Sequence, residues 1–410
     1  MLEKKIGRRK FVKNVSMAGA SAVIVTSRTR PILGANDRVV MGIIGSGGMG
    51  RNHLNKTKTL GVEWVAVADV YDINLQKGLE IIGPGAKGYT DYRQLLDRKD
   101  IDAVLISTPE HWHHDHLLAA LKAGKDAYSE KPMSWSIEQG LDMVNAVRKT
   151  DRIVQIGMQR RSSPLVREAK AIIEEGLIGE INLVRAEWFW NIPPINRDPA
   201  LPGKLDWDAF LGPAPKIPFD AIRFRNWRYF WDYSGGNMTD QGTHLLDVIQ
   251  WFNNVEQPIA AQTFGAVYKL QPSQTPDTFC AIFEFSQFMC TWTLAYMNTF
   301  MKGWGVVFQG QKGTLELSED GYRVFAEPWS EKGYDRFKTP TPIRQNLAGG
   351  ATDTLPHWIN FLECVKSRKQ PNATVEIGFR AVRPLHLANI AQHNLNRAEL
   401  GADGYSVRLS

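Results

Sequence analysis

The run Val39 to Gly50, VVMGIIGSGGMG, constrains the fold of this chain more than any other stretch, because an apolar segment ends there in closely spaced glycines. It predicts a strand, a tight turn and a helix. In the spacing G-x-G-x-x-G, Gly45 makes the turn, Gly47 lets the backbone approach a pyrophosphate, and Gly50 lets the helix pack closely on the strand. Glycine is common here, with 35 in 410 residues, so the pattern alone would also suit a plain loop–helix junction.

The next predicted strand, Trp64 to Ala68, ends at an acidic residue and gives the glycines their context. Asp69 lies 24 positions after Gly45, close to the separation at which a carboxylate reaches the ribose hydroxyls of adenosine. Val70 and Tyr71 follow it, rather than an Arg or Ser that would accept a 2′-phosphate. NAD is therefore predicted over NADP as cofactor. A helix N-cap is the alternative role of Asp69.

Further alternation of strands and helices extends the first domain. A strand over 102–109, a helix over 113–123 and a strand over 126–129 predict an α/β fold with a Rossmann-type, doubly wound parallel sheet. Lys131, held by Pro132 just after a strand, would lie at the carboxyl edge where such sheets bind ligands. Four histidines between positions 111 and 116 resemble a metal site, but no cysteine or second carboxylate cluster supports one. A polar helix entry and no metal are predicted.

Beyond Ile153 the hydrophobic pattern changes to a period of two residues, which predicts a second, α+β domain with a large, mostly antiparallel open sheet. Residues 193–228 are rich in Pro, Trp, Arg and Asp, and we expect a long functional loop there, because its aromatic side chains would be costly to leave unpacked. Two helices, over 357–365 and 377–394, should pack back on the first domain. The predicted strands of the second domain are 181–189, 260–268, 278–285, 289–294 and 305–308.

Several of these motifs resemble the Gfo/Idh/MocA family, whose founders are glucose–fructose oxidoreductase and inositol dehydrogenase. They are the glycine loop, Thr108-Pro109-Glu110-His111-Trp112-His113, Ala123-Gly124-Lys125 and, most specifically, Glu130-Lys131-Pro132. The resemblance covers nearly the whole chain after its first 35 residues. Together with the residues above, it implies a nicotinamide-cofactor site made of Gly45, Gly47, Met49, Gly50, Asp69, Thr108, Pro109, His111 and Glu130.

A second chemical cluster lies between Ser234 and Asp247, in the pattern G-G-x-x-x-D-x-G-x-H-x-x-D. Asp240 and His244 are four residues apart, so they would share one face of a helix. By the family resemblance, His244 is the acid/base at the substrate hydroxyl, Asp240 orients the substrate or tunes the histidine, and Lys131 shares the proton work and polarises the oxygen. The alternative is a capping aspartate and a packed histidine. Asp247 is expected to be structural.

Three further residues are candidates for the substrate side. Gln159 and Arg160 lie near the expected boundary between cofactor and substrate, where each could bond a sugar hydroxyl or only join the domains. Trp188 could stack on a sugar ring, and ordinary core packing is its alternative role. The expected substrate is a small carbohydrate.

The first 35 residues have eight Lys or Arg and one acid, a net charge of +7, which accounts for the whole chain's net charge of +6. The remaining chain has 41 basic and 42 acidic residues, a net charge of −1, which argues against nucleic acid as a partner. Gly7 to Lys13 resembles a twin-arginine export motif, and the uncharged stretch 14–27 is too short and mild to span a bilayer. We expect the twin-arginine translocation machinery as a partner and a periplasmic or outer membrane-associated location. A disordered basic tail is the alternative.

The expected organisation is a signal segment at 1–35, an NAD-binding domain at 36–157 and a substrate and oligomerisation domain at 158–410. Because twin-arginine export carries folded proteins that have typically loaded a cofactor, a tightly bound NAD is expected. A free face on the large sheet predicts a homo-oligomer. The three cysteines do not imply a disulfide framework, and Cys280 and Cys290 are expected to be buried thiols.

Three functions remain open. The first is an NAD-dependent oxidoreductase acting on a secondary hydroxyl of a sugar, polyol or glycoside. The second is a redox-neutral glycosidase or lyase that oxidises the sugar ring transiently and returns the hydride to it. The third is a non-catalytic sugar-binding module, which the combination of Lys131, Asp240 and His244 disfavours.

Overall fold

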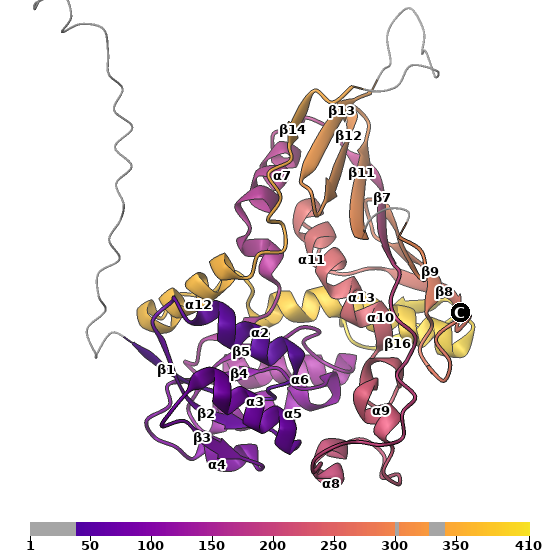
Figure 1. Ribbon diagram of the computed structural model, residues 1–410. Helices are drawn as coiled ribbons and strands as arrows, with labels where there is room; N and C mark the ends of the chain where they lie inside the picture. The colour runs from indigo at the N-terminus through magenta and orange to yellow at the C-terminus, as the bar shows by residue number, and fades with distance from the viewer. Residues whose placement is uncertain (1–37, 300–302, 328–340) are drawn as a thin grey trace, which may run out of the picture. The chain divides into compact units, whose positions relative to one another are not determined.

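Six parallel strands form the first sheet, in the order β3-β2-β1-β4-β5-β6 (Figure 1). This is the strand order of a Rossmann dinucleotide-binding fold. Its strands β1, β4, β5 and β6 are almost completely buried, as expected where helices cover both faces, whereas β2 is partly exposed and β3, at the edge, is largely exposed. The strands are β1 Val39–Ile44, β2 Val62–Ala68, β3 Lys87–Tyr89, β4 Ala103–Ile106, β5 Asp126–Ser129 and β6 Val154–Ile156. The helices are α2 Gly48–Thr57, α3 Asp72–Ile82, α4 Tyr92–Leu96, α5 His113–Lys122 and α6 Ile137–Arg148, with a 3₁₀ turn at Glu110–Trp112.

The computed structural model describes residues 38–299, 303–327 and 341–410, and the predicted signal segment at 1–35 lies outside these ranges. Residues from Val39 onward form one unit. Within the described ranges, no helix is both long and apolar enough to cross a membrane.

Ten strands form the second sheet, in the order β14-β13-β12-β11-β7-β10-β9-β8-β15-β16. In the described part of this sheet, β7 and β10 pair in parallel and the other neighbouring strands pair antiparallel. Both parts of the predicted fold class are therefore confirmed. The strands are β7 Ile181–Trp190, β8 Ala260–Ala266, β9 Thr278–Glu284, β10 Met289–Tyr296, β11 Gly303–Gly310, β12 Gly313–Ser318, β13 Tyr322–Ala326, β14 Arg344–Asn346, β15 Ala398–Leu400 and β16 Val407–Leu409.

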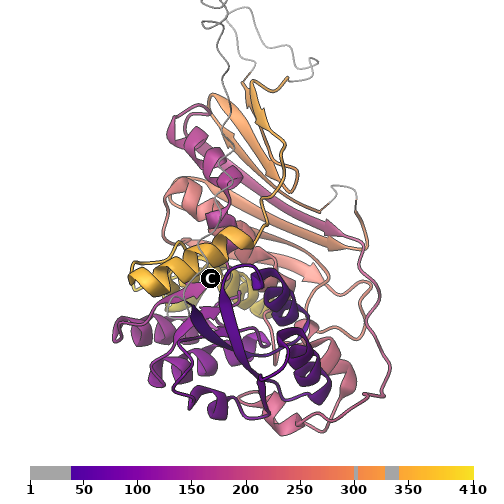
Figure 2. The same ribbon diagram turned by 60° about the vertical axis from the view of Figure 1, so that its left-hand side comes forward.

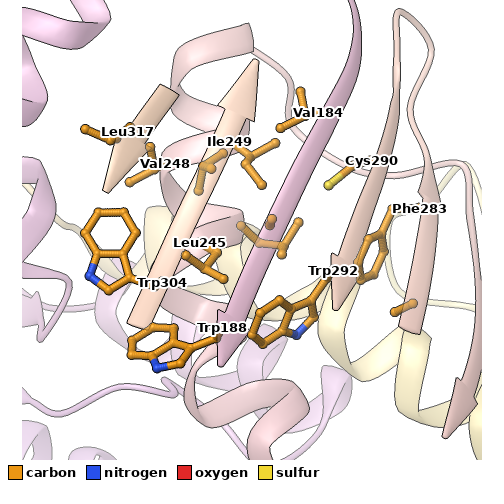
Figure 3. Close-up of a cluster of buried hydrophobic side chains, with 14 of the residues drawn as sticks. Val184, Trp188, Leu245, Val248, Ile249, Phe283, Cys290, Trp292, Trp304 and Leu317 are labelled. Carbon is orange, nitrogen blue, oxygen red and sulfur yellow. The ribbon is translucent and has the colours of Figure 1, made fainter. Parts of the chain in front are cut away.

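One face of the second sheet is covered by helices α7 Pro164–Glu174, α11 Gly242–Asn253 and α13 Val375–Asn394. Figure 3 shows Leu245 and Ile249 of α11 packed against Val184 and Trp292 of the strands. On the opposite face, Phe264 is 68% exposed. Cys280 points to that face because Phe279 and Ala281 beside it point inward, so Cys280 is exposed. The expectation of a buried thiol is wrong for Cys280 and confirmed for Cys290.

A long segment, residues 193–233, leaves the end of β7 and reaches the first sheet before the chain returns (Figures 1 and 2). We call it the arm. It contains α8 Trp207–Leu211, α9 Ala221–Arg225 and a 3₁₀ turn at Trp227–Tyr229. Asp206 and Asp220 cap the two short helices with their carboxylates. As expected for an ordered loop, most of its aromatic side chains pack together in a small core, whereas Phe219 is 52% exposed.

The two C-terminal helices pack against the first domain. Trp358 of α12, Leu355–Ser367, donates from Nε1 to Nδ1 of His53 on α2 at 2.8 Å. Phe379 of α13 fills the space beside Gly140 of α6, where a Cβ would lie 2.5 Å from its ring. Helices α12 and α13 thus pack against opposite faces of the first sheet.

Candidate active site

The carboxyl ends of β1, β2, β4 and β5 open on one cavity of about 870 Å³. Open α/β sheets bind ligands at this edge, where neighbouring strand ends leave a crevice. Thr108, Pro109 and Met49 all line it. The predicted cofactor and catalytic residues that line the cavity are Gly45, Gly47, Met49, Asp69, Thr108, Pro109, Glu130, Lys131 and Asp240.

The three glycines of the loop have three different surroundings. Gly45 has a φ of +88°, and a Cβ there would lie 2.9 Å from the backbone of Ser107. A Cβ on Gly50 would lie 2.4 Å from the Gly45 oxygen, so α2 could not approach β1 with a larger residue. At Gly47 a Cβ would meet nothing within 4 Å, because the backbone there faces the cavity. This is the cradle that a dinucleotide pyrophosphate needs, and α2 begins directly behind it.

Asp69 follows β2 and is fixed by backbone groups on both sides. Its Oδ2 accepts from the Ser46 N–H at 2.8 Å and its Oδ1 accepts from the Tyr71 N–H at 2.9 Å. Burial raises the pKa of Asp69 to about 6, against the opposing effect of these two bonds. At pH 7 it is therefore mostly a carboxylate with remaining lone pairs toward the cavity, which suits ribose hydroxyl donors.

Lys131 and Asp240 form a nearly buried ion pair on the cavity wall. Nζ of Lys131 donates to Oδ1 of Asp240 at 2.5 Å and to its main-chain oxygen at 2.9 Å. The side chains are 11% and 6% exposed. Burial would raise the pKa of Asp240, but the charges of Lys131 and Arg228 lower it below its ordinary value. An ammonium has three N–H donors, so one is left for a substrate oxygen.

The helix expected to carry both Asp240 and His244 is split. Asp240 ends α10, Gly236–Asp240, and His244 lies in the first turn of α11, with Gln241 between the two helices. The Thr243 hydroxyl donates to the Thr239 carbonyl at 2.7 Å. In a continuous helix, that carbonyl would instead accept a backbone hydrogen bond. Asp240 and His244 are close in the sequence, but they lie on two separate helices and do not share one helical face.

His244 lies behind the cavity wall and does not line it. Its Nδ1 is buried and has no hydrogen-bond partner. Burial, followed by the positive charges of Lys131 and Arg160, lowers the pKa of His244 well below 6.5. The imidazole is therefore neutral at pH 7, the protonation state that a general base requires. Its predicted catalytic role stays a prediction.

Glu130 is held by a buried chain that starts on the C-terminal helix α12. Because Trp358 Nε1 can only donate, Nδ1 of His53 accepts, and Nε2 of His53 carries the proton that it donates to Oε1 of Glu130 at 2.7 Å. Burial alone would raise the pKa of Glu130, but the bond from His53 and the charge of Lys131 hold it below its ordinary value. Glu130 is thus an oriented carboxylate directly before Lys131.

Glu110 is a buried link between the first domain and the catalytic segment that sequence reasoning missed. Its carboxylate accepts from the Ser234 hydroxyl at 2.6 Å, the Gly235 N–H at 2.9 Å and the Thr239 hydroxyl at 3.1 Å. Burial, and next the charge of Asp240, raise the pKa of Glu110 to about 7. Its place directly after Pro109 at a strand end was the only sequence signal for this role.

Arg228 of the arm is a second missed residue, and it contacts Asp240 from the side opposite Lys131. Its Nε donates to Oδ2 of Asp240 at 3.2 Å, while its guanidinium lies 4.3 Å from the centre of the Trp227 ring. Both residues line the cavity. An arginine set among tryptophans in a predicted functional loop was the available signal.

Besides His244 and Gly50, four more predicted residues lie outside the cavity wall. His111 is buried, and its Nε2 donates to the Phe210 carbonyl at 2.9 Å. Arg160 donates to the His244 carbonyl at 3.1 Å and lies 3.6 Å from the Trp304 ring centre. The remaining two are Gln159, in the 3₁₀ turn Gln159–Ser162, and Trp188, which is buried with its Nε1 unpartnered.

Arg160 and Trp188 therefore both lie against His244, Arg160 through the bond to its carbonyl and Trp188 with its ring centre 6.5 Å from that of the imidazole. Asp247 has the expected structural role, because it accepts from Arg161 at 2.7 Å and both side chains are buried. Among the residues that the structure describes, no group of three or more His, Cys, Asp or Glu is arranged to hold a metal ion.

Comparison with known families agrees with this geometry. Residues 39–158 match the oxidoreductase family described as GFO_IDH_MocA, NAD-binding Rossmann fold, and residues 165–405 match its C-terminal alpha/beta domain. The chain belongs to the Gfo/Idh/MocA oxidoreductase family. The predicted resemblance and the predicted type of NAD-binding oxidoreductase are thus confirmed at the level of the family.

Curated relatives match mainly through the first domain. The inositol 2-dehydrogenase/D-chiro-inositol 3-dehydrogenase of Lactiplantibacillus plantarum is 34% identical over 143 residues, 34% of this chain and 41% of that protein. The inositol 2-dehydrogenase of Azotobacter vinelandii is 32% identical over 144 residues, again 34% of this chain and 42% of the relative. The chain thus matches less than half the length of these relatives.

Solved structures match over most of the chain. The WlbA dehydrogenase from Bordetella pertussis, in complex with NADH and UDP-GlcNAcA, has a TM-score of 0.69 and 20% identity, covering 89% of this chain and 98% of its own. A levoglucosan dehydrogenase in complex with NADH and levoglucosan has a TM-score of 0.68 and 18% identity, covering 88% and 99%. At these identities the likeness shows a shared two-domain fold.

Proposed function

We propose that this protein is an NAD-dependent oxidoreductase that oxidises or reduces a secondary hydroxyl of a sugar, polyol or glycoside. The observation that carries the proposal is that the Lys131–Asp240 pair and the glycine cradle line the same cavity. A dinucleotide bound from Asp69 along the glycine loop would extend toward Lys131. The cofactor, when bound, accepts or supplies the hydride, and the protein supplies geometry and proton handling.

The roles of the protein groups follow from their bonding. Lys131 is held by Asp240 through two hydrogen bonds, which leaves its remaining donor to polarise the reacting oxygen. His244 is neutral in its buried setting, the protonation state of a proton acceptor, and because it does not line the cavity, this role requires the substrate hydroxyl to come within hydrogen-bond reach of it. Arg228 holds the second oxygen of Asp240, which keeps that carboxylate directed at Lys131.

A carbohydrate substrate is supported by two independent lines. The relatives named above include inositol dehydrogenases, and one structural neighbour was solved with levoglucosan. In this chain, the Trp227 ring lines the cavity beside Arg228, and flat aromatic faces bind the C–H-rich faces of sugar rings. NAD is proposed over NADP because the Asp69 carboxylate would repel a 2′-phosphate.

Turnover of a carbohydrate panel tests this function. With added NAD and a panel of polyols, sugars and glycosides, the wild type should form reduced nicotinamide or a changed sugar. Lys131→Ala and His244→Ala should abolish that activity, typically a loss of at least about 100-fold for a lost acid/base group, while nucleotide remains bound. Full activity in either variant would refute the assigned roles, and Lys170→Ala on α7 is a control lysine outside the cavity.

The redox-neutral reaction is the second candidate, and the predicted export favours it. Outside the cytoplasm no NAD pool is expected, so a cofactor would have to be retained and returned to its starting state by the same or a second substrate. We propose export with bound cofactor by the twin-arginine route. Replacing Arg8 and Arg9 by lysine should keep the protein in the cytoplasm, and unchanged export of that variant would contradict this route.

The two reactions are separated by the need for added cofactor. Purified mature protein is incubated with glycosides without added NAD. Continued turnover supports the redox-neutral reaction, whereas strict dependence on added NAD contradicts it and weakens the argument from export. We also propose a homo-oligomer, because Phe264 on the outer face of β8 and Tyr268 just beyond that strand are 68% and 69% exposed. A monomeric mass by light scattering would contradict it.

A further inference from the structure

The arm forms the outer side of the cavity, opposite the glycine loop. It is anchored at β7 of the second domain, yet its middle part lies against the ends of β2 and β4 of the first domain (Figures 1 and 2). The cavity is therefore walled by two segments far apart in the sequence. The arm residues that line it are Asp206, Asp208, Ala209, Phe210, Gly212, Phe224, Arg225, Trp227 and Arg228.

A first seam joins the arm to the end of β2, beside Asp69. The Asp72 N–H donates to the Lys204 carbonyl at 3.0 Å, and the Asp206 N–H donates to the Val70 carbonyl at 2.9 Å. Between these bonds, Tyr71 and Leu205 stand opposite each other in an antiparallel bridge. The Tyr71 hydroxyl adds a bond to the Pro202 carbonyl at 2.6 Å. The arm is thus hydrogen-bonded, through an isolated antiparallel bridge, to the segment that directly follows β2.

A second seam joins the arm to the end of β4. The Phe210 carbonyl accepts from Nε1 of Trp112 at 2.8 Å and from Nε2 of His111 at 2.9 Å. Gly212 then turns the chain with a φ of +51°, and a Cβ there would lie 2.0 Å from the Trp112 ring. His111, which does not line the cavity, therefore acts as an attachment point for the arm.

We propose that the arm is the second half of the dinucleotide site and retains the cofactor by closing over it between these two seams. A dinucleotide that reaches from Asp69 to Lys131 has to pass beneath residues 206–212 and cannot leave while both seams are intact. The inference rests on the proposed function, because it requires that a nicotinamide dinucleotide occupies this cavity. In this proposal, the backbone hydrogen bonds that hold the arm also retain the cofactor beneath it.

A reversible lock across the first seam tests the proposal. Tyr71 and Leu205 form a non-hydrogen-bonded antiparallel pair, whose Cα atoms lie about 4.5 Å apart, within the range that a disulfide spans. The double variant Tyr71→Cys/Leu205→Cys is loaded with NAD, oxidised, and chased with isotope-labelled NAD. We expect the oxidised form to exchange its nucleotide at least tenfold more slowly than the same protein after reduction. Equal exchange rates before and after reduction would overturn the proposal.

The lock has its own controls. Leu205→Cys alone cannot form the disulfide, so its bound nucleotide should exchange at the same rate in the oxidised and reduced states. Because this variant keeps the exposed Cys280, it also controls for oxidation of that thiol. Loss of the Tyr71 ring affects the oxidised and reduced forms equally, so their ratio reports only the lock.

A loosening variant tests the same seam from the opposite direction. Gly203 has a φ of +77°, and a Cβ there would lie 2.3 Å from Oδ1 of Asp72, so Gly203→Ala should lift the arm and release NAD several-fold faster. Gly176→Ala is the matched control, because Gly176 has a φ of +71° but no atom within 4 Å of its Cβ position. Equal release from these two variants would overturn the proposal.

Failure of this inference is distinguishable from failure of the proposed function. If the purified protein binds neither NAD nor NADP, both fail. If it binds nucleotide and converts a carbohydrate, but neither the lock nor Gly203→Ala changes exchange, only the retaining role of the arm is refuted.

Discussion

Replacing Glu110 by glutamine should change how the stability of the protein depends on pH. The wild-type carboxyl is fully buried and its pKa is raised from 4.5 to about 7. A raised pKa means that the folded state binds the proton more tightly than the unfolded state. The stability that this proton provides is present below pH 4.5 and is lost as the pH rises through about 7. The amide of Glu110→Gln cannot lose a proton, so the stability of this variant should not fall as the pH rises through about 7.

The size of the effect follows from the shift. A change of about 2.5 pKa units corresponds to about 3 kcal/mol, at about 1.4 kcal/mol per unit. The free energy of unfolding of the wild type should therefore fall by about 3 kcal/mol relative to Glu110→Gln between about pH 4 and pH 8. The buried histidines titrate in both proteins, so the difference between the two proteins isolates Glu110.

Urea unfolding at a series of pH values measures this difference, with tryptophan fluorescence and far-ultraviolet circular dichroism as two probes. Only coincident transitions are converted to free energies, as a two-state description requires. Glu63→Gln, at an exposed position of β2, controls for loss of a surface charge. A difference between wild type and Glu110→Gln that stays constant across this pH range would refute the assigned burial and bonding of Glu110.

Three further predictions follow from the site. Asp69→Ala should weaken NAD binding about 10-fold or more, as expected for lost hydrogen bonds to a charged group, and should narrow the preference over NADP; calorimetric titration with both nucleotides measures this, and an unchanged preference would contradict it. Lys131→Met should raise the pKa of His244, because a neighbouring positive charge disfavours the imidazolium; NMR titration of labelled histidine should show this rise, and a fall would contradict it. Trp358→Phe should cost about 0.5–1.5 kcal/mol of stability for a lost hydrogen bond and leave Nδ1 of His53 without its donor; an unaltered unfolding free energy would exclude that bond.

The parts of the site that sequence reasoning predicted depend on local spacing. Gly45, Gly47 and Gly50 specify a turn and a close helix approach within six residues, and Asp69 and Lys131 follow strands whose apolar runs mark their ends. Such features require only the geometry of a strand and the next helix, which a short stretch of sequence contains.

The missed parts depend on contacts between residues far apart in the chain. Glu110 bonds Ser234, 124 positions later, and Trp358 bonds His53, 305 positions earlier. No local pattern marks either partner, because a buried carboxylate or indole finds its partner only when the two domains pack. The exposed face of Cys280 was missed for a related reason, since the phase of an alternating strand is decided by the face on which helices pack.

Hydride tracing tests the central claim most directly. Protein loaded with NAD is mixed with carbohydrates that carry deuterium on the carbon of a secondary hydroxyl, and the nucleotide is then recovered for mass spectrometry. The account predicts that deuterium reaches the nicotinamide ring in the wild type, and that Lys131→Ala holds nucleotide but transfers no label. Absence of label with every carbohydrate, or equal transfer by Lys131→Ala, would contradict it.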